Sequence, residues 1–201
     1  MRREPDEASV RAQLKGEIRH RRLITRKALP EESREARSAA IVERVLGLPE
    51  WEASSTVLAF VSMRREVQTG ALVEAAWDAG KTVATTRMNA TFDDLELRRW
   101  DRETALEESG MMFLQPAADA PAVADEDVDL IVVPALAVDE RGHRIGYGKG
   151  FYDRLLPRME RALRVAVIFD FERIVEVPNL PGDAPVDVVV TDARVFRTDA
   201  R

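Results

Sequence analysis

Short apolar runs alternate along this chain with longer segments in which apolar residues recur every three or four positions. The apolar runs are rich in Val, Ile and Leu and predict strands, mostly buried. We expect strands at 56–61, 81–85, 95–100, 129–133, 164–169 and 186–191. The longer segments predict helices, which we expect at 8–28, 31–47, 70–79 and 150–162. The run at 95–100 alternates between apolar and polar residues, which is typical of a half-exposed strand.

Residues typical of helix ends support two of these boundaries. Pro30 and the two glutamates after it suit the first turn of a helix, where a proline needs no N–H partner and acids favour the helix dipole. Gly80 follows the third helix at a position typical of a C-terminal cap. Residues 101–127 are acidic and rich in Pro and Ala, so we expect an irregular segment with short elements.

The order of these elements predicts the fold class. Apolar strands that alternate with helices favour an α/β domain whose central sheet is largely parallel and covered on both faces. We therefore expect one three-layer α/β/α domain over residues 1–201, with an N-terminal helical segment. Residues 1–7 and 195–201 are expected to be flexible ends.

Composition excludes several classes of protein. The chain has no cysteine, so it has neither disulfides nor thiolate metal sites nor a cysteine nucleophile. Its net charge of −6 argues against a general nucleic-acid binder. The apolar run at 130–138 is too short to span a membrane, and the N-terminus lacks the pattern of a secretory signal. We expect a cytoplasmic protein that binds neither nucleic acid nor membrane.

The most informative segment is 144–154, RIGYGKGFYDR, which we call the glycine segment. Alternating glycines allow the backbone to approach a ligand closely and to turn its N–H groups toward an anion. Lys149, between two of these glycines, adds a compact positive charge suited to phosphate. Asp153 supplies oxygen atoms of the kind that Mg²⁺ prefers. The segment predicts a polyphosphate site.

Three other interpretations compete for the glycine segment. A Walker loop does not fit, because the glycine required ahead of Gly148 is missing. In addition, Gly150 follows Lys149 where a Walker loop has Ser or Thr. A dinucleotide fingerprint fits poorly, because its glycine spacing differs and it must directly follow a strand, although Asp170 could serve as a ribose ligand. The simplest interpretation is a glycine-rich turn that only connects a strand to a helix.

Two further groups of residues could take part in a site. Lys15 and Arg19 are four residues apart and project from one helix face, where they could bind phosphate or merely pair with nearby acids. Glu66 follows an apolar strand, and ligands of open α/β sheets bind beyond the carboxyl ends of strands. It could accept hydrogen bonds from an amine-bearing ring, or be an ordinary exposed acid.

Taken together, these motifs resemble the 5-formyltetrahydrofolate cyclo-ligase family. The resemblance runs from Lys15 to about Asp192 and is most specific in 133–144, VPALAVDERGHR, which leads into the glycine segment. Three weaker matches occur in the family's order: KGEIR at 15–19, SMRREVQT at 62–69, and VP at 177–178 with GDAPVD at 182–187. Four matches in the expected order are stronger than any one alone.

The resemblance implies a role for each matching residue. Lys149, Arg144 and Tyr152 would be catalytic, and Asp153 and Asp183 would hold Mg²⁺. The residues that would contact ATP are Lys15, Arg19, Arg144, Ile145, Gly146, Tyr147, Gly148, Lys149, Gly150, Phe151 and Tyr152. The residues that would face the folate are Val61, Glu66, Tyr147, Gly148, Lys149, Gly150 and Phe151, with Glu66 on the pterin.

The implied reaction is the ATP-driven closure of 5-formyltetrahydrofolate to 5,10-methenyltetrahydrofolate, by a monomer or weak homodimer. The chain departs from the family pattern at Thr85 and Thr86, at Gly182 and at Glu172. These departures leave open a relative with the same ATP site and another substrate. The basic cluster of Arg21, Arg22 and Arg26 could attract a polyglutamate tail by charge.

Overall fold

The computed structural model describes residues 6–63, 65–110 and 113–199. Its helices are α1 Glu7–Ala28, α2 Glu31–Leu46, α3 Pro49–Ala53, α4 Gly70–Asp78 and α5 Phe151–Leu155, with short 3₁₀ turns at Asp125–Asp127, Leu156–Arg158 and Asp170–Glu172. Its strands are β1 Thr56–Leu58, β2 Thr82–Met88, β3 Leu95–Arg99, β4 Leu106–Glu108, β5 Leu114–Pro116, β6 Leu130–Pro134, β7 Ala137–Val138, β8 Arg144–Ile145, β9 Leu163–Val167, β10 Val188–Val190 and β11 Val195–Arg197. The predicted α/β class is confirmed.

Seven strands form the central sheet in the order β11-β10-β9-β6-β1-β2-β3. The five inner strands, from β10 to β2, are parallel, and the edge strands β11 and β3 are antiparallel to their neighbours. The register pairs Val57 with Val83 on one side of β1 and with Leu130 on the other. Such continuous apolar strands are typical of a parallel sheet that is buried on both faces.

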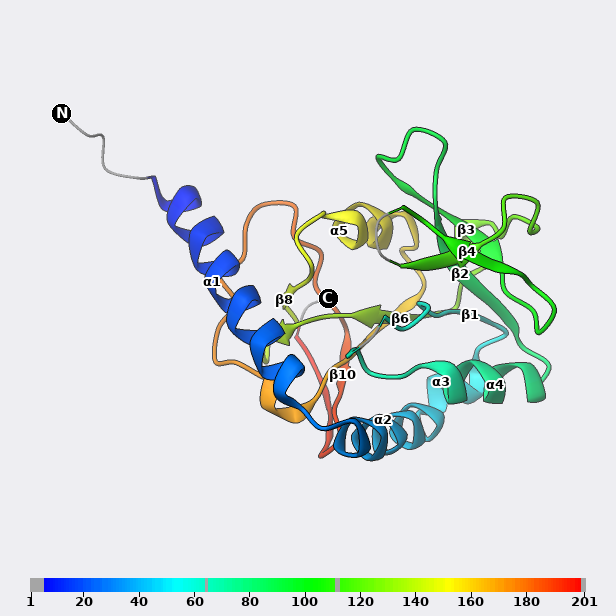
Figure 1. Cartoon of the computed structure of the whole chain (residues 1–201), viewed down its shortest axis with the longest axis horizontal. Coiled ribbons are helices and arrows are strands. Elements are labelled where there is room, and N and C mark those ends of the chain that lie inside the picture. Colours follow the sequence, from blue (N-terminus) through cyan, green and yellow to red (C-terminus); the bar gives the residue numbers. More distant parts are fainter. Residues whose placement is uncertain (1–5, 64, 111–112, 200–201) are drawn as a thin grey trace.

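Helices and loops cover the two faces of the sheet (Figure 1). Because successive side chains of a strand point to opposite faces, Leu130 and Val132 join the core beneath α2, α3 and α4. Ile131 and Val133 join the second core, together with Leu155 of α5. The sheet is therefore the middle of three layers, as expected from the apolar runs.

Helix α1 lies apart from these layers, along the side of the molecule where the parallel strands end (Figure 1). Arg22 of α1 donates to the carbonyl of Phe171, which follows β9, at 2.8 Å. Arg26 donates to the carbonyl of Ala135, which follows β6, at 2.6 Å. The helix thus crosses the carboxyl ends of the inner strands, where an open α/β sheet binds its ligands.

Several boundaries differ from the sequence prediction. The helix expected over 150–162 ends at Leu155 and continues as a 3₁₀ turn, because Pro157 lacks an N–H group and disfavours the α-helix before it. The short elements expected within 101–127 include strands β4 and β5, which pair with each other. Residues 195–197 form the edge strand β11, so the flexible end predicted from residue 195 is wrong there. No helix among the described residues has the length and apolar character to cross a membrane.

Candidate active site

Residues 146–150 of the glycine segment form a tight connection between β8 and α5. Gly148 has a φ of 95° and Gly150 a φ of 69°, conformations that L side chains rarely adopt. A Cβ at Gly146 would meet no atom within 4 Å, so neither its backbone conformation nor a neighbouring group requires glycine there. An open backbone at Gly146 is what close approach of a ligand needs.

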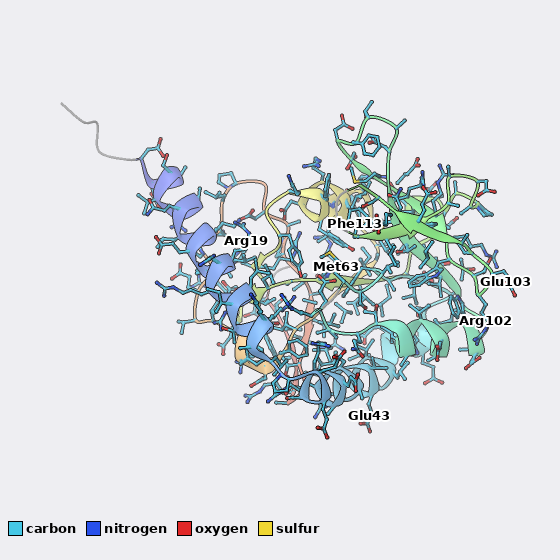
Figure 2. All side chains as sticks on the ribbon, in the orientation of Figure 1. Arg19, Glu43, Met63, Arg102, Glu103 and Phe113 are labelled. Atoms are coloured by element: carbon cyan, nitrogen blue, oxygen red, sulfur yellow. The ribbon has the colours of Figure 1, made fainter. Side chains whose placement is uncertain are left out.

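Helix α1 is held against this segment by Arg19. Its Nε donates to the carbonyl of Gly146 at 2.9 Å. A Cβ added at Gly148 would lie 3.1 Å from Cζ of Arg19, so the guanidinium packs directly on the glycine backbone. Figure 2 shows Arg19 on the side of α1 that faces the rest of the molecule. Arg19, a candidate phosphate contact, therefore lies against the glycine segment.

The two candidate metal carboxylates lie close together, and each meets a cation. Asp183 accepts from Nζ of Lys15 at 2.6 and 2.8 Å. Asp153 accepts from Nη2 of Arg144 at 2.8 Å and from the backbone N–H of Ala184 at 3.2 Å. Lys15 therefore pairs with an acid 168 residues away, not with the nearby glutamates that the simpler interpretation offered.

Arg144 is almost fully buried beneath these carboxylates. It also donates to the carbonyl of Ala184, next to Asp183. Burial lowers the pKa of Arg144, while the charges of Asp153 and Asp183 act in the opposite direction. Arg144 thus ties the start of the glycine segment to the loop that carries Asp183.

Lys149 and the aromatic residues of the segment differ in exposure. Lys149 is exposed, and its ammonium makes no hydrogen bond or ion pair with the described residues. Tyr152 has a buried hydroxyl near Thr86, and burial raises its pKa. Phe151 begins α5 and lies under the guanidinium of Arg154, and Ile145 is fully buried in β8. Lys149 is the cation of the segment that is available to a ligand.

Glu66 is buried, with 3% of its surface exposed, so the interpretation as an exposed acid is wrong. Its carboxylate accepts the N–H of Met63 at 2.8 Å, and the hydroxyl of Tyr147 lies near it. Burial raises the pKa of Glu66, and these two neighbours oppose that effect. Val61 lies half-buried in the same loop, whereas Arg64 falls outside the described residues. The glycine segment and the loop after β1 therefore meet at Tyr147 and Glu66.

A buried ion pair behind Tyr147 escaped the sequence analysis. Arg26 contacts Glu172 through two hydrogen bonds of 2.5 and 2.8 Å and donates to the Tyr147 hydroxyl at 3.1 Å. Burial lowers the pKa of Arg26, but Glu172, together with Tyr147 and Glu66, outweighs this effect and raises it. Arg26 is only 3% exposed, so the prediction that it belongs to a basic surface for a polyglutamate tail is wrong.

A helical stripe could have revealed Arg26 in the sequence. Positions 15, 19, 22 and 26 are spaced by four, three and four residues, so their side chains share one helix face. All four contact the strand-end loops or the glycine segment. A row of four cations on one helix face is therefore the sequence signal for their pairing with other parts of the fold.

The structure has one feature of a dinucleotide-binding fold and lacks the other features of that fold. A strand, β8, which the sequence analysis did not expect, does run directly into Gly146. It has only two residues, however, and pairs antiparallel with β7 outside the central sheet. Asp170 accepts from Thr191 at 2.9 Å and pairs with Arg194, so its carboxylate is engaged within the protein. The arrangement lacks the parallel strand-to-helix turn that a dinucleotide fold requires.

Comparison with known proteins agrees with the geometry. The model of the 5-formyltetrahydrofolate cyclo-ligase family matches residues 11–192. The 5-formyltetrahydrofolate cyclo-ligase of Mycolicibacterium smegmatis is 32% identical over 185 residues, which cover 90% of this chain and 94% of that protein. The Escherichia coli K12 enzyme of the same name is 27% identical over 175 residues, covering 85% and 96%.

Solved structures give the same result. The NMR structure of Aquifex aeolicus 5,10-methenyltetrahydrofolate synthetase is 32% identical, has a TM-score of 0.82, and covers 92% of this chain and 93% of that one. The structure of a Mycoplasma pneumoniae 5,10-methenyltetrahydrofolate synthetase, 16% identical with a TM-score of 0.73, shares the fold. This chain belongs to the 5-formyltetrahydrofolate cyclo-ligase family.

Proposed function

We propose that this protein uses ATP and Mg²⁺ to convert 5-formyltetrahydrofolate to 5,10-methenyltetrahydrofolate, with release of ADP and phosphate. One observation carries the proposal most: a single segment contacts both halves of the candidate site. Gly146 and Gly148 meet Arg19 of α1 on one side, while Tyr147 reaches the buried Glu66 on the other. A reaction that joins two substrates needs such a shared boundary.

The phosphate half of the site would be formed by cations and backbone N–H groups. Lys149 is exposed and unpaired among the described residues, so it can neutralise a terminal phosphate. Arg19 and the open backbone at Gly146 would approach the phosphate chain from α1 and from the glycine segment. Phosphoryl transfer needs mainly positioning and charge neutralisation, which these groups supply without a protein nucleophile.

The carboxylates fit a magnesium ion that is bound together with phosphate. Mg²⁺ is commonly held by one or two carboxylates plus substrate phosphates, not by an all-protein cage. Asp153 and Asp183 provide two carboxylates, and no cluster of three or more potential ligands occurs among the described residues. When bound, the ion would neutralise charge on the phosphates. Lys15 and Arg144 hold the two carboxylates in place.

The folate half would be formed by Glu66 and Tyr147, with Val61 at its edge. A buried carboxylate that keeps unused acceptor capacity suits the N–H and amino groups of a pterin ring. The formyl oxygen, facing Lys149, would attack the terminal phosphorus of ATP, and ADP would leave. The second folate nitrogen would then attack the activated formyl carbon and lose its proton. The C–O bond would break with its electron pair leaving on phosphate, which yields the methenyl ring.

We expect the purified protein to form methenyltetrahydrofolate from 5-formyltetrahydrofolate only when ATP and Mg²⁺ are both present. The rise in near-ultraviolet absorbance of the methenyl product measures the reaction. Removal of Mg²⁺ by a chelator should abolish the rise, and an excess of Mg²⁺ should restore it, because the phosphates then lose and regain their counter-charge. ATP binding without any product would contradict the proposal and favour a relative with another substrate. Cytoplasmic location and a monomeric or weakly dimeric state stay predictions.

Gly148→Ala should weaken ATP binding more than it weakens the fold. The new Cβ would lie 3.1 Å from the Arg19 guanidinium, so Arg19 would be displaced from the phosphate half of the site. We expect the KM for ATP to rise about tenfold, the equivalent of about 1.4 kcal/mol. Gly80→Ala is a matched control, because Gly80 also has a positive φ but its Cβ would meet nothing within 4 Å. An equal rise in KM for both variants would argue against a role for Arg19.

A further inference from the structure

Arg26 and Glu172 form an ion pair that is buried beside the folate half of the site. Arg26 is 3% exposed and Glu172 is fully buried. Both carboxylate oxygens of Glu172 accept from Arg26, and one of them also accepts the N–H of Phe169 at 3.1 Å. Two further N–H groups of Arg26 donate to the carbonyl of Ala135 and to the hydroxyl of Tyr147. Backbone groups of Phe169 and Ala135 thus hold Glu172 and Arg26 in place, and Tyr147 connects the pair to the glycine segment.

Through Tyr147 this pair reaches Glu66. The hydroxyl of Tyr147 accepts from Arg26 at 3.1 Å and lies near the Glu66 carboxylate, close enough for the two groups to influence each other's charge. The ionisable groups that act on Glu66 come from four elements: Arg26 of α1, Tyr147 of the glycine segment, Tyr152 of α5 and Glu172 after β9. Arg26 is the one cation in this group of four residues, and both Glu66 and Glu172 interact with its charge.

We propose that Arg26 and Glu172 are a positioning pair, which holds Tyr147 against Glu66 and sets the charge that surrounds the Glu66 carboxylate. Glu172 anchors Arg26 at hydrogen-bond distance, and Arg26 in turn fixes the Tyr147 hydroxyl. Glu172 pairs with Arg26 through two hydrogen bonds and compensates much of its charge. It therefore limits how far Arg26 can stabilise the ionised form of Glu66. Neither residue of the pair needs to touch substrate. The inference rests on the proposed function, in which Glu66 receives the folate ring.

The charges predict opposite effects for two variants. Arg26 lowers the pKa of Glu66 and Glu172 raises it. Glu172→Gln keeps the shape of the side chain and leaves Arg26 charged, so Glu66 should titrate at lower pH than in the native protein. Adding Arg26→Gln removes that cation and, because the effect of Arg26 on Glu66 exceeds that of Glu172, should move the titration above the native one.

The titration of Glu66 can be measured without any substrate. In protein labelled with ¹³C at glutamate carboxyl carbons, the Glu66 signal is the one that Glu66→Gln removes. We expect it to titrate at lower pH in Glu172→Gln and at higher pH in the double variant Arg26→Gln/Glu172→Gln. Glu176→Gln is the matched control, since Glu176 is exposed and near in sequence, and it should leave the titration unchanged.

The catalytic readout should follow the same directions. If folate binding needs ionised Glu66, the acid limb of the kcat/KM profile moves to lower pH in Glu172→Gln and back upward in the double variant. A pair that serves only stability would lower the unfolding temperature and leave both the Glu66 titration and this limb in place, which would overturn the inference. If the double variant does not fold, the direction in which Glu172→Gln moves the Glu66 titration tests the inference by itself. Absence of product from the native protein would instead overturn the proposed function.

Discussion

Lys149→Ala should lower kcat by about 10²–10³-fold, the usual cost of removing one group that stabilises transition-state charge. The ammonium of Lys149 is exposed and makes no hydrogen bond or ion pair with the described residues, so its charge is available for a ligand. Its removal would leave charge on the transferred phosphoryl group without its nearest counter-charge. Steady-state kinetics with saturating ATP and folate measures the loss.

The same substitution should leave the fold intact. A solvated side chain without partners contributes little packing, so denaturation by urea should give the native midpoint. Lys27→Ala is a suitable control, because Lys27 is an exposed cation of α1 and belongs to neither half of the site. Activity close to native in Lys149→Ala would show that the terminal phosphate lies elsewhere.

The sequence predicted the inner strands well because their physical signal is local. Val132 and its neighbours in β6 are apolar on both faces, and only a strand covered on both sides requires that pattern. The end of α5 was predicted too late, although Pro157 marks it, because the apolar residues beyond it suggested continued helical spacing. The error lies in weighing periodicity above the geometry of proline.

The site divides in the same way. The glycine segment, Lys15 and Arg19 could be predicted, since glycine alternation and helical spacing are visible along the chain. The pairing of Arg26 with Glu172 could not, because the two residues are 146 positions apart and only the folded chain joins them. Buried charges are expected to be paired, yet nothing in the sequence gives their partner. For the same reason the sequence left open whether Glu66 is an exposed acid or faces a ligand.

Arg26→Met should lower the free energy of unfolding by about 3–5 kcal/mol, the usual cost of removing one partner from a buried ion pair. Glu172 would remain with a carboxylate that is fully buried and has lost its cation. Methionine fills a comparable apolar space, so lost packing contributes less than the unpaired charge. Urea denaturation at neutral pH measures the change.

Arg22→Met separates this effect from the loss of any α1 cation. Among the described residues, half-buried Arg22 donates to the carbonyl of Phe171 and acts on Glu172 by charge less than Arg26 does, so its removal should cost about 1 kcal/mol.

The difference in free energy of unfolding between the two variants should also depend on pH. Without Arg26, burial holds the pKa of Glu172 above its unfolded value, so the variant is penalised least below the unfolded pKa and increasingly as pH rises toward the folded one. If both variants lost the same free energy of unfolding at every pH, the pair would carry no buried charge. A buried charge requires that the difference between the two losses becomes smaller at acid pH.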